Sequence, residues 1–103
     1  PKARRSVAQK FFKHFIKLGV DPHLIADVMC FNLEIAQTFS MEKNVPDSFF
    51  RSMLNSFNEV IHFTSVHGVL PEFKERILKI YTETQKQKWL FEDEFSKALD
   101  ILD

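Results

Sequence analysis

Three short segments of similar composition divide this chain at nearly equal intervals, and they constrain its fold more than any other feature. They are Gly19–Pro22, Asn44–Asp47 and Gly68–Pro71, and their valines stand 25 and 24 residues apart. Gly or Asn can take the left-handed conformation that ends a helix, and proline suits the first turn of the next helix. We therefore expect an all-α protein in which helices of roughly 20 residues are joined by very short turns.

The predicted helices span residues 3–18, 22–40, 46–66, 71–86 and 89–102. Short joints place successive helices side by side in opposite directions, so we expect one domain, an antiparallel bundle of four to five helices. The number depends on the last third of the chain, which has no Gly or Pro after Pro71. Either the chain bends near 86–89 and a fifth helix folds back, or residues 71–102 form one helix of about 47 Å.

Apolar periodicity predicts which side of each helix faces the core. The second helix is apolar on several sides, so we expect it to be the most buried, with Phe31 and Leu33 off its main stripe. The expected inward residues of this helix are Leu24, Ile25, Val28, Met29, Ile35, Ala36 and Phe39. The expected inward residues of the third are Phe49, Phe50, Met53, Leu54, Phe57, Val60, Ile61 and Thr64, and those of the fourth are Phe73, Ile77, Ile80 and Tyr81.

The joints also organise an internal repeat. At the eighth position after each joint valine stand Val28, Met53 and Ile77, and the fourth and ninth positions are apolar as well. Each helix would then place apolar residues on one face at the same distances from its joint. Joints of one chemistry explain this through a fixed helix phase, which is the preferred interpretation. The alternative is a duplicated helical unit, which would make the chain a short helical-repeat-like segment.

Composition limits the classes of function. The net charge is zero, with 14 basic and 14 acidic residues, and no apolar run is long enough to span a bilayer. The single cysteine, Cys30, cannot form an internal disulfide and suits an intracellular compartment, cytoplasmic or nuclear. The chain begins with Pro rather than Met, so we expect a fragment of a larger protein.

No motif predicts catalysis, a cofactor or a metal. Glu59 and His62 have the Glu-x-x-His spacing of di-iron bundles, but those sites need the motif twice and two further carboxylates. Cys30 has no partner cysteine and is expected to be a small buried residue, and the chain has no glycine-rich phosphate loop. We therefore expect no enzymatic activity, no cofactor and no small-molecule substrate.

The first helix is basic. Residues 1–20 carry six bases and no acid, and the face that could contact an anion or a nucleic acid comprises Arg4, Arg5, Lys10, Lys13 and Lys17. The remainder of the chain is acidic, so a solvated face, or one paired with the acidic middle segment, is the competing interpretation.

Two families resemble parts of the chain. Residues 8–22 resemble the second helix and joint of a pentatricopeptide repeat, a resemblance that implies RNA binding by a helical-repeat segment. Gln9-Lys10-Phe11 through Val20-Asp21-Pro22 to Leu33-Glu34, followed by Val45-Pro46, is similar to the N-terminal helical domain of bacterial stress-response phosphatases and to the related C-terminal domain of the cyanobacterial clock protein KaiA. This second resemblance implies a helical domain that dimerises and binds a regulatory partner.

The function expected from the residues is protein–protein interaction within a larger regulatory or scaffolding protein. The partner would be another protein or a second copy of the chain, with no membrane involved. Aromatic anchors often dominate such interfaces. We expect the binding residues to lie in the C-terminal segment and to comprise Trp89, Phe91, Phe95, Leu99 and Leu102. The competing interpretation is that these residues complete the core.

Overall fold

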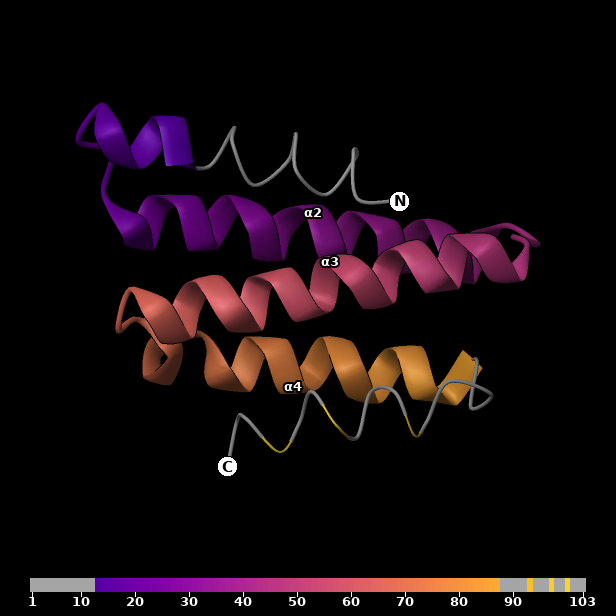
Figure 1. Cartoon of the computed structure of the whole chain (residues 1–103). Coiled ribbons are helices and arrows are strands. Elements are labelled where there is room, and N and C mark those ends of the chain that lie inside the picture. The colour runs from indigo at the N-terminus through magenta and orange to yellow at the C-terminus, as the bar shows by residue number, and fades with distance from the viewer. Residues whose placement is uncertain (1–12, 88–92, 94–96, 98–99, 101–103) are drawn as a thin grey trace.

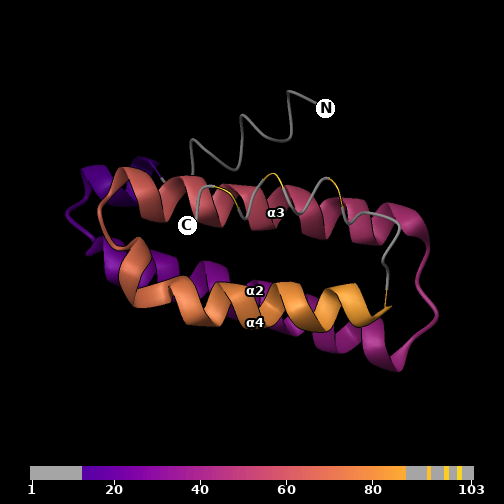
Figure 2. The same cartoon turned by 90° about the horizontal axis from the view of Figure 1, so that it is seen from below.

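The computed structural model describes residues 13–87 together with residues 93, 97 and 100, and within them the protein is all-α, with helices and turns and no strand. Residues 13–17 are helical and lead into α2 (Pro22–Glu42), α3 (Asp47–Val66) and α4 (Leu70–Gln87). The chain reverses its direction at each joint (Figure 1). Each of the three labelled helices packs against the other two, and α3 lies to one side of α2 and α4 (Figure 2).

The glycine joints end their helices in the way that the sequence predicts. Gly19 and Gly68 have φ of 85° and 71°, the left-handed region that glycine adopts without a steric penalty. In the third joint, the Val69 N–H donates to the Thr64 carbonyl at 2.9 Å and the Gly68 N–H donates to the Ser65 carbonyl at 3.3 Å. This pair of bonds is the Schellman motif, which satisfies carbonyl groups that the helix end would otherwise leave unpaired.

The first joint repeats this arrangement and adds an N-cap. The Val20 N–H donates to the Phe15 carbonyl at 3.0 Å, and the Asp21 carboxylate then accepts the His23 N–H at 2.9 Å, which caps α2. Pro22 stands in the first turn of α2, where its missing N–H costs no hydrogen bond.

The second joint differs from the prediction, because Asn44 does not take the left-handed conformation. No non-glycine residue among those described has a positive φ. Instead α2 ends at Glu42, and the extended backbone of its C-cap Lys43 (φ −122°, ψ 149°) leads into an irregular stretch before Pro46. Left-handed backbone is unfavourable for residues with a Cβ, such as Asn44. Val45, the residue before Pro46, also prefers an extended conformation. An extended connection therefore replaces the tight stop here.

The core lies where the three helices meet. The predicted inward face of α3 is confirmed, because seven of its eight residues are buried and Phe49 is half-buried. On α4, Ile77 and Ile80 are buried as expected, and Phe73 and Tyr81 are half-buried against the core. The buried apolar residues of the described chain are Ile25, Ala26, Met29, Cys30, Leu33, Phe50, Met53, Leu54, Phe57, Val60, Ile61, Val69, Ile77 and Ile80.

The predicted inward face of α2 is wrong in most of its residues. Four of the seven residues expected in the core are exposed, namely Leu24, Val28, Ile35 and Phe39. Leu33, expected off the stripe, is buried at 2% exposure. The proposed repeat therefore fails at its eighth position, where Val28 is exposed and Met53 and Ile77 are buried. At its ninth position Met29 and Leu54 are buried and Leu78 is half-buried against the core. The expectation that α2 is the most buried helix also fails, since α2 and α3 each bury seven residues.

The reason for this orientation lies in the inward residues of α2, several of which are small. Ala26 and Cys30 are fully buried, and small side chains allow neighbouring helices to approach closely. Ser40 is buried as well, and its hydroxyl donates to the Gln37 carbonyl at 2.6 Å and lies 3.2 Å from the Gln87 side-chain oxygen on α4. α2 contacts two neighbouring helices. It approaches both more closely with its smaller residues inward than it would with the bulkier apolar residues of its other side inward.

Candidate interaction surface

The residues that the sequence singled out for function fall largely outside the described part of the chain. All five expected partner-binding residues, Trp89, Phe91, Phe95, Leu99 and Leu102, lie outside it, as do Arg4, Arg5 and Lys10 of the basic face. Lys13 and Lys17 are described, and both are exposed. The structure therefore brings together none of the predicted sets, and the predictions that concern them stay predictions.

An exposed apolar surface, most of whose residues were expected in the core, is the most distinctive feature of the described chain. Five apolar side chains on α2 are between 46% and 57% exposed, and we call them the α2 row: Leu24, Val28, Phe31, Ile35 and Phe39. At 3.6 residues per turn they fall within an arc of roughly 80° and extend over about 22 Å. The buried residues of α2 lie on the opposite side of the helix. The row therefore points away from the core, and at its end the Phe39 ring also meets Phe49 on α3, with centroids 5.6 Å apart.

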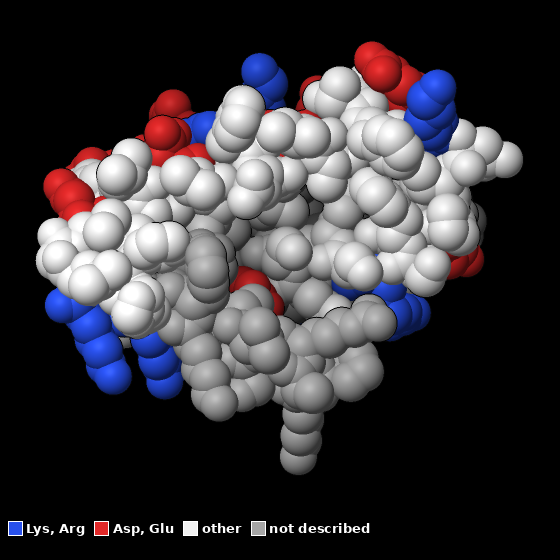
Figure 3. Space-filling model, turned by 90° about the horizontal axis from the view of Figure 1, so that it is seen from above, with Lys and Arg blue, Asp and Glu red and all other residues white. Residues whose placement is uncertain are grey.

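The area of the α2 row is that of the largest apolar patch on a typical monomer. Two of the five are phenylalanines, which cover roughly 150–250 Å² each when buried, and the three aliphatic side chains cover less, so the half-exposed row presents on the order of 500 Å² at most. The largest apolar patch on a typical monomer is about 300–600 Å² and is often functional. Figure 3 shows a broad band of uncharged surface over α2, with charged side chains gathered toward its edges.

An ion-pair cluster borders the row on the side of α4. The Arg76 guanidinium on α4 donates to both carboxylate oxygens of Glu34, at 2.9 and 2.6 Å, and to the Asp27 carboxylate as well. The carboxylate of Glu34 is the main reason that the pKa of Arg76 is raised above its ordinary value. Both acids stand on α2, so a bidentate contact fixes the rotation of α2 relative to α4.

A second polar contact ties the start of α2 to the start of α4. His23 lies between two carboxylates, with Nε2 2.6 Å from Glu72 and Nδ1 3.2 Å from Asp21. Hydrogen bonding to Glu72, and then to Asp21, raises the pKa of the His23 imidazole above its ordinary value. The ring also lies beside Phe73, with centroids 6.4 Å apart. The imidazole is therefore a pH-sensitive link between the two helices.

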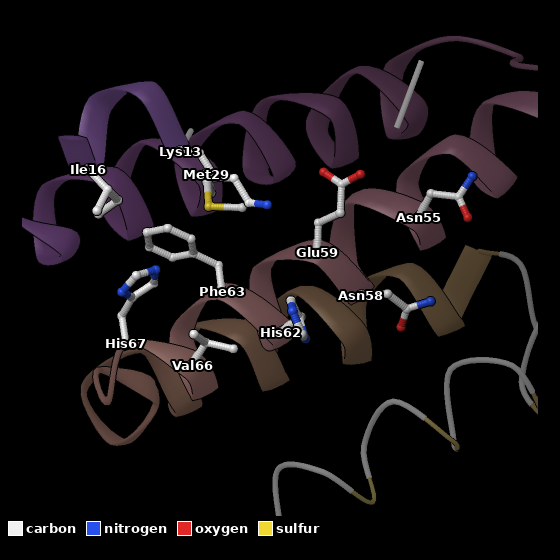
Figure 4. A pocket seen from close by; sticks show the side chains of 10 residues that line it. All are labelled: Lys13, Ile16, Met29, Asn55, Asn58, Glu59, His62, Phe63, Val66 and His67. Carbon is white, nitrogen blue, oxygen red and sulfur yellow. The ribbon is translucent and has the colours of Figure 1, made fainter. Parts of the chain in front are cut away.

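A pocket of about 450 Å³ lies between residues 13–16, α2 and α3 (Figure 4). Its lining mixes apolar and polar side chains: Lys13, Ile16, Met29, Asn55, Asn58, Glu59, His62, Phe63, Val66 and His67. The Phe63 and His67 rings lie against each other with centroids 4.4 Å apart. The lining combines amides, an acid and imidazoles without convergence on one kind of ligand.

The described residues contain no group of three or more His, Cys, Asp and Glu side chains placed to hold a metal ion. Cys30 is fully buried, and burial raises the pKa of its thiol to about 11. The thiolate is the reactive form of cysteine, so this thiol is inert at neutral pH. None of the helices in the described part of the chain has the length and apolar character needed to cross a membrane.

Comparison with known proteins places the chain in a family without assigning an activity. A family model described as "Family of unknown function (DUF6155)" matches residues 1–103, so the chain belongs to this family. No curated protein and no solved structure matches the chain.

Proposed function

We propose that this chain is a non-enzymatic protein–protein interaction module, and that the α2 row is its binding surface. The single observation that carries the proposal is the row itself: five apolar side chains, about half exposed, on the side of α2 that faces away from the core. Covering them would remove on the order of 500 Å² of apolar surface from water, which is favourable by roughly 25 cal/mol per Å² before the costs of association.

The chemistry of the described polar residues supports a binding role over a catalytic one. The charged contacts of Arg76 and His23 join one helix to another and so serve the fold. The buried thiol of Cys30 is protonated at neutral pH and is a poor nucleophile. These features suit a rigid platform that presents a surface.

The proposal extends to the whole fold and its setting. We propose that the complete domain is an antiparallel bundle of four to five helices within a larger regulatory or scaffolding protein, because the joints at Gly19 and Gly68 turn the chain as the sequence predicts. A free buried cysteine suits a cytoplasmic or nuclear location. The C-terminal aromatic residues stay a second predicted contact region, outside the described residues.

Site-specific photo-crosslinking tests the proposal. Phe31, at the centre of the row, is replaced by p-benzoylphenylalanine, which keeps an aromatic side chain at that position. Lys79, exposed on α4, is replaced in the same way as the matched control. In cells of the source organism, irradiation should join the Phe31 variant to a protein chain and leave the Lys79 variant without that adduct. Equal labelling at both positions, or no protein adduct at Phe31, would refute the proposal.

A further inference from the structure

We propose that the α2 row binds a second copy of this chain, with the two α2 helices packed antiparallel about a two-fold axis near Phe31. This inference rests on the proposed function, which it deepens by naming the partner. It is drawn from the order of the residues along the row, from the area that they expose and from the charges at their border.

The order of the row is nearly the same in both directions along the helix. Its successive spacings are four, three, four and four residues, close to the alternating threes and fours of a helix–helix seam. Reversal about a point between Phe31 and Asn32 exchanges Leu24 with Phe39 and Val28 with Ile35. In a two-fold contact, if one residue meets a second residue of the other copy, the second residue also meets the first residue of that copy. The patch must therefore be complementary to its own reverse.

The pairs that this reversal creates are complementary in size. Leu24 would meet the Phe39 of the other copy, and Val28 would meet its Ile35, so each end of the contact joins a smaller side chain to a larger one. The two Phe31 rings would meet at the axis, where aromatic pairs can stack with an offset or meet edge to face. Asn32 is the exposed polar residue beside the axis.

The area suits a weak or moderate dimer. Two rows facing each other bury on the order of 1,000 Å², and the side chains that flank the row bring the total toward the roughly 1,200–2,000 Å² of specific interfaces. A heterologous partner would need no reversal symmetry, so the symmetric spacing favours a second copy over an unrelated protein.

The acidic charges at the border oppose self-association less than their number implies, because Arg76 compensates them in part. α2 has acidic residues and no lysine or arginine, and an antiparallel pair brings Asp27 of one copy toward Glu34 of the other along one edge. Each of these carboxylates accepts a hydrogen bond from the Arg76 of its own chain. One arginine faces two carboxylates in each copy, so about half of the acidic charge at this edge is neutralised before the copies meet.

Sedimentation velocity of the purified chain over a wide dilution series tests the inference. The unmodified chain should show a monomer–dimer equilibrium. Val28→Lys and Ile35→Glu should each weaken the dimer by roughly tenfold or more, because each places one charge in the centre of an apolar contact. Lys79→Glu, a charge change on the exposed side of α4, should leave the equilibrium unchanged.

A mixture of the two α2 variants tests the direction of packing. In the antiparallel arrangement, position 28 of one copy meets position 35 of the other. An equimolar mixture of V28K and I35E would therefore pair the introduced lysine of one chain with the introduced glutamate of the other, and it should dimerise more tightly than either variant alone. A parallel arrangement offers no such pairing. Tighter dimerisation of the mixture supports the proposal, and its absence overturns the antiparallel arrangement.

The remaining outcomes separate this inference from the proposed function. A chain that is monomeric at every concentration overturns the second copy as partner, while crosslinks from Phe31 to another protein in cells would leave the interaction role standing. A dimer that survives both variants places the contact elsewhere and overturns the inference. Should either charged variant fail to fold, irradiation of the purified chain with p-benzoylphenylalanine at Phe31 decides the matter, because an adduct of twice the chain mass is required.

Discussion

Leu33 and Ile35 provide the most direct test of how α2 is oriented. They stand two residues apart on the same helix and have side chains of equal size, yet Leu33 is 2% exposed and Ile35 is 52% exposed. Apolar periodicity alone predicts the reverse. Truncation of both residues to alanine therefore compares a core position with a surface position while the helix and the size of the deletion stay the same.

The expected losses follow from these exposures. Leu33→Ala removes a fully packed side chain and leaves a cavity, which costs about 2–5 kcal/mol. A domain of this size is stable by only about 5–15 kcal/mol, and each kcal/mol shifts Tm by roughly 4–8 °C, so the loss should exceed about 8 °C. Ile35→Ala should stay within about 0.5 kcal/mol, because little packing is lost and alanine favours the helix more than isoleucine does.

Urea unfolding followed by circular dichroism measures both losses. The chain must be dilute enough to be monomeric, and the midpoints must agree at two dilutions, since self-association through the row would add to the apparent stability of the unmodified chain. Equal m-values show that the same surface unfolds in each variant. If Ile35→Ala destabilises the chain as much as Leu33→Ala does, α2 does not present the row to solvent, and the interaction surface is wrong.

Four further predictions concern single residues. Gly68→Ala should lower the free energy of unfolding by about 1–2 kcal/mol in urea, because φ of 71° is unfavourable for alanine although no atom lies within 4 Å of the added Cβ. Arg76→Gln should cost about 1–3 kcal/mol and lose part of that effect in high salt, because the side chain is 30% exposed and its charged hydrogen bonds are partly screened. The raised pKa of His23 means that its contribution to stability is fully present below the unfolded pKa of about 6.5 and is lost as pH rises through the folded value. Tm differences between the unmodified chain and His23→Gln, measured across that window, should shrink toward alkaline pH, and a constant difference would contradict the assignment. Cys30 should resist alkylation at neutral pH in the folded chain and react in urea, as thiol titration would show, because it is fully buried and burial raises its pKa to about 11.

The joints show which parts of the fold can be read from the sequence. Gly19 and Gly68 could be placed because left-handed backbone is inexpensive only for glycine, so the residue type nearly determines the conformation. Asn44 could not be placed in the same way, because asparagine tolerates that conformation without requiring it. There the chain takes an extended path before Pro46.

The contrast between α3 and α2 shows why faces are harder to predict than helices. On α3 the apolar residues form one stripe and the exposed polar residues Asn55, Asn58 and His62 mark the other side, so the inward face is unambiguous. On α2 apolar residues stand on two opposite sides, and periodicity cannot choose between them. The spacing of the row can be seen in the sequence, but the same spacing is typical of a buried helix face. Only the packing of the other helices shows that this face is exposed.

What chooses between the two faces of α2 is a set of contacts made by α4, 42 and 49 residues away in the chain. Asp27 and Glu34 lie to one side of the row, where Arg76 binds both. Half a turn of α2 about its axis would bury the row, but it would carry both acids away from Arg76 and replace the fully packed Ala26 and Cys30 with bulkier side chains between the helices. The bulkier apolar face thus stays in solvent because charge pairing and close packing hold the other face inward. A surface kept outward in this way against the hydrophobic effect is consistent with an interface, and the Arg76→Gln variant should for this reason weaken self-association as well as the fold.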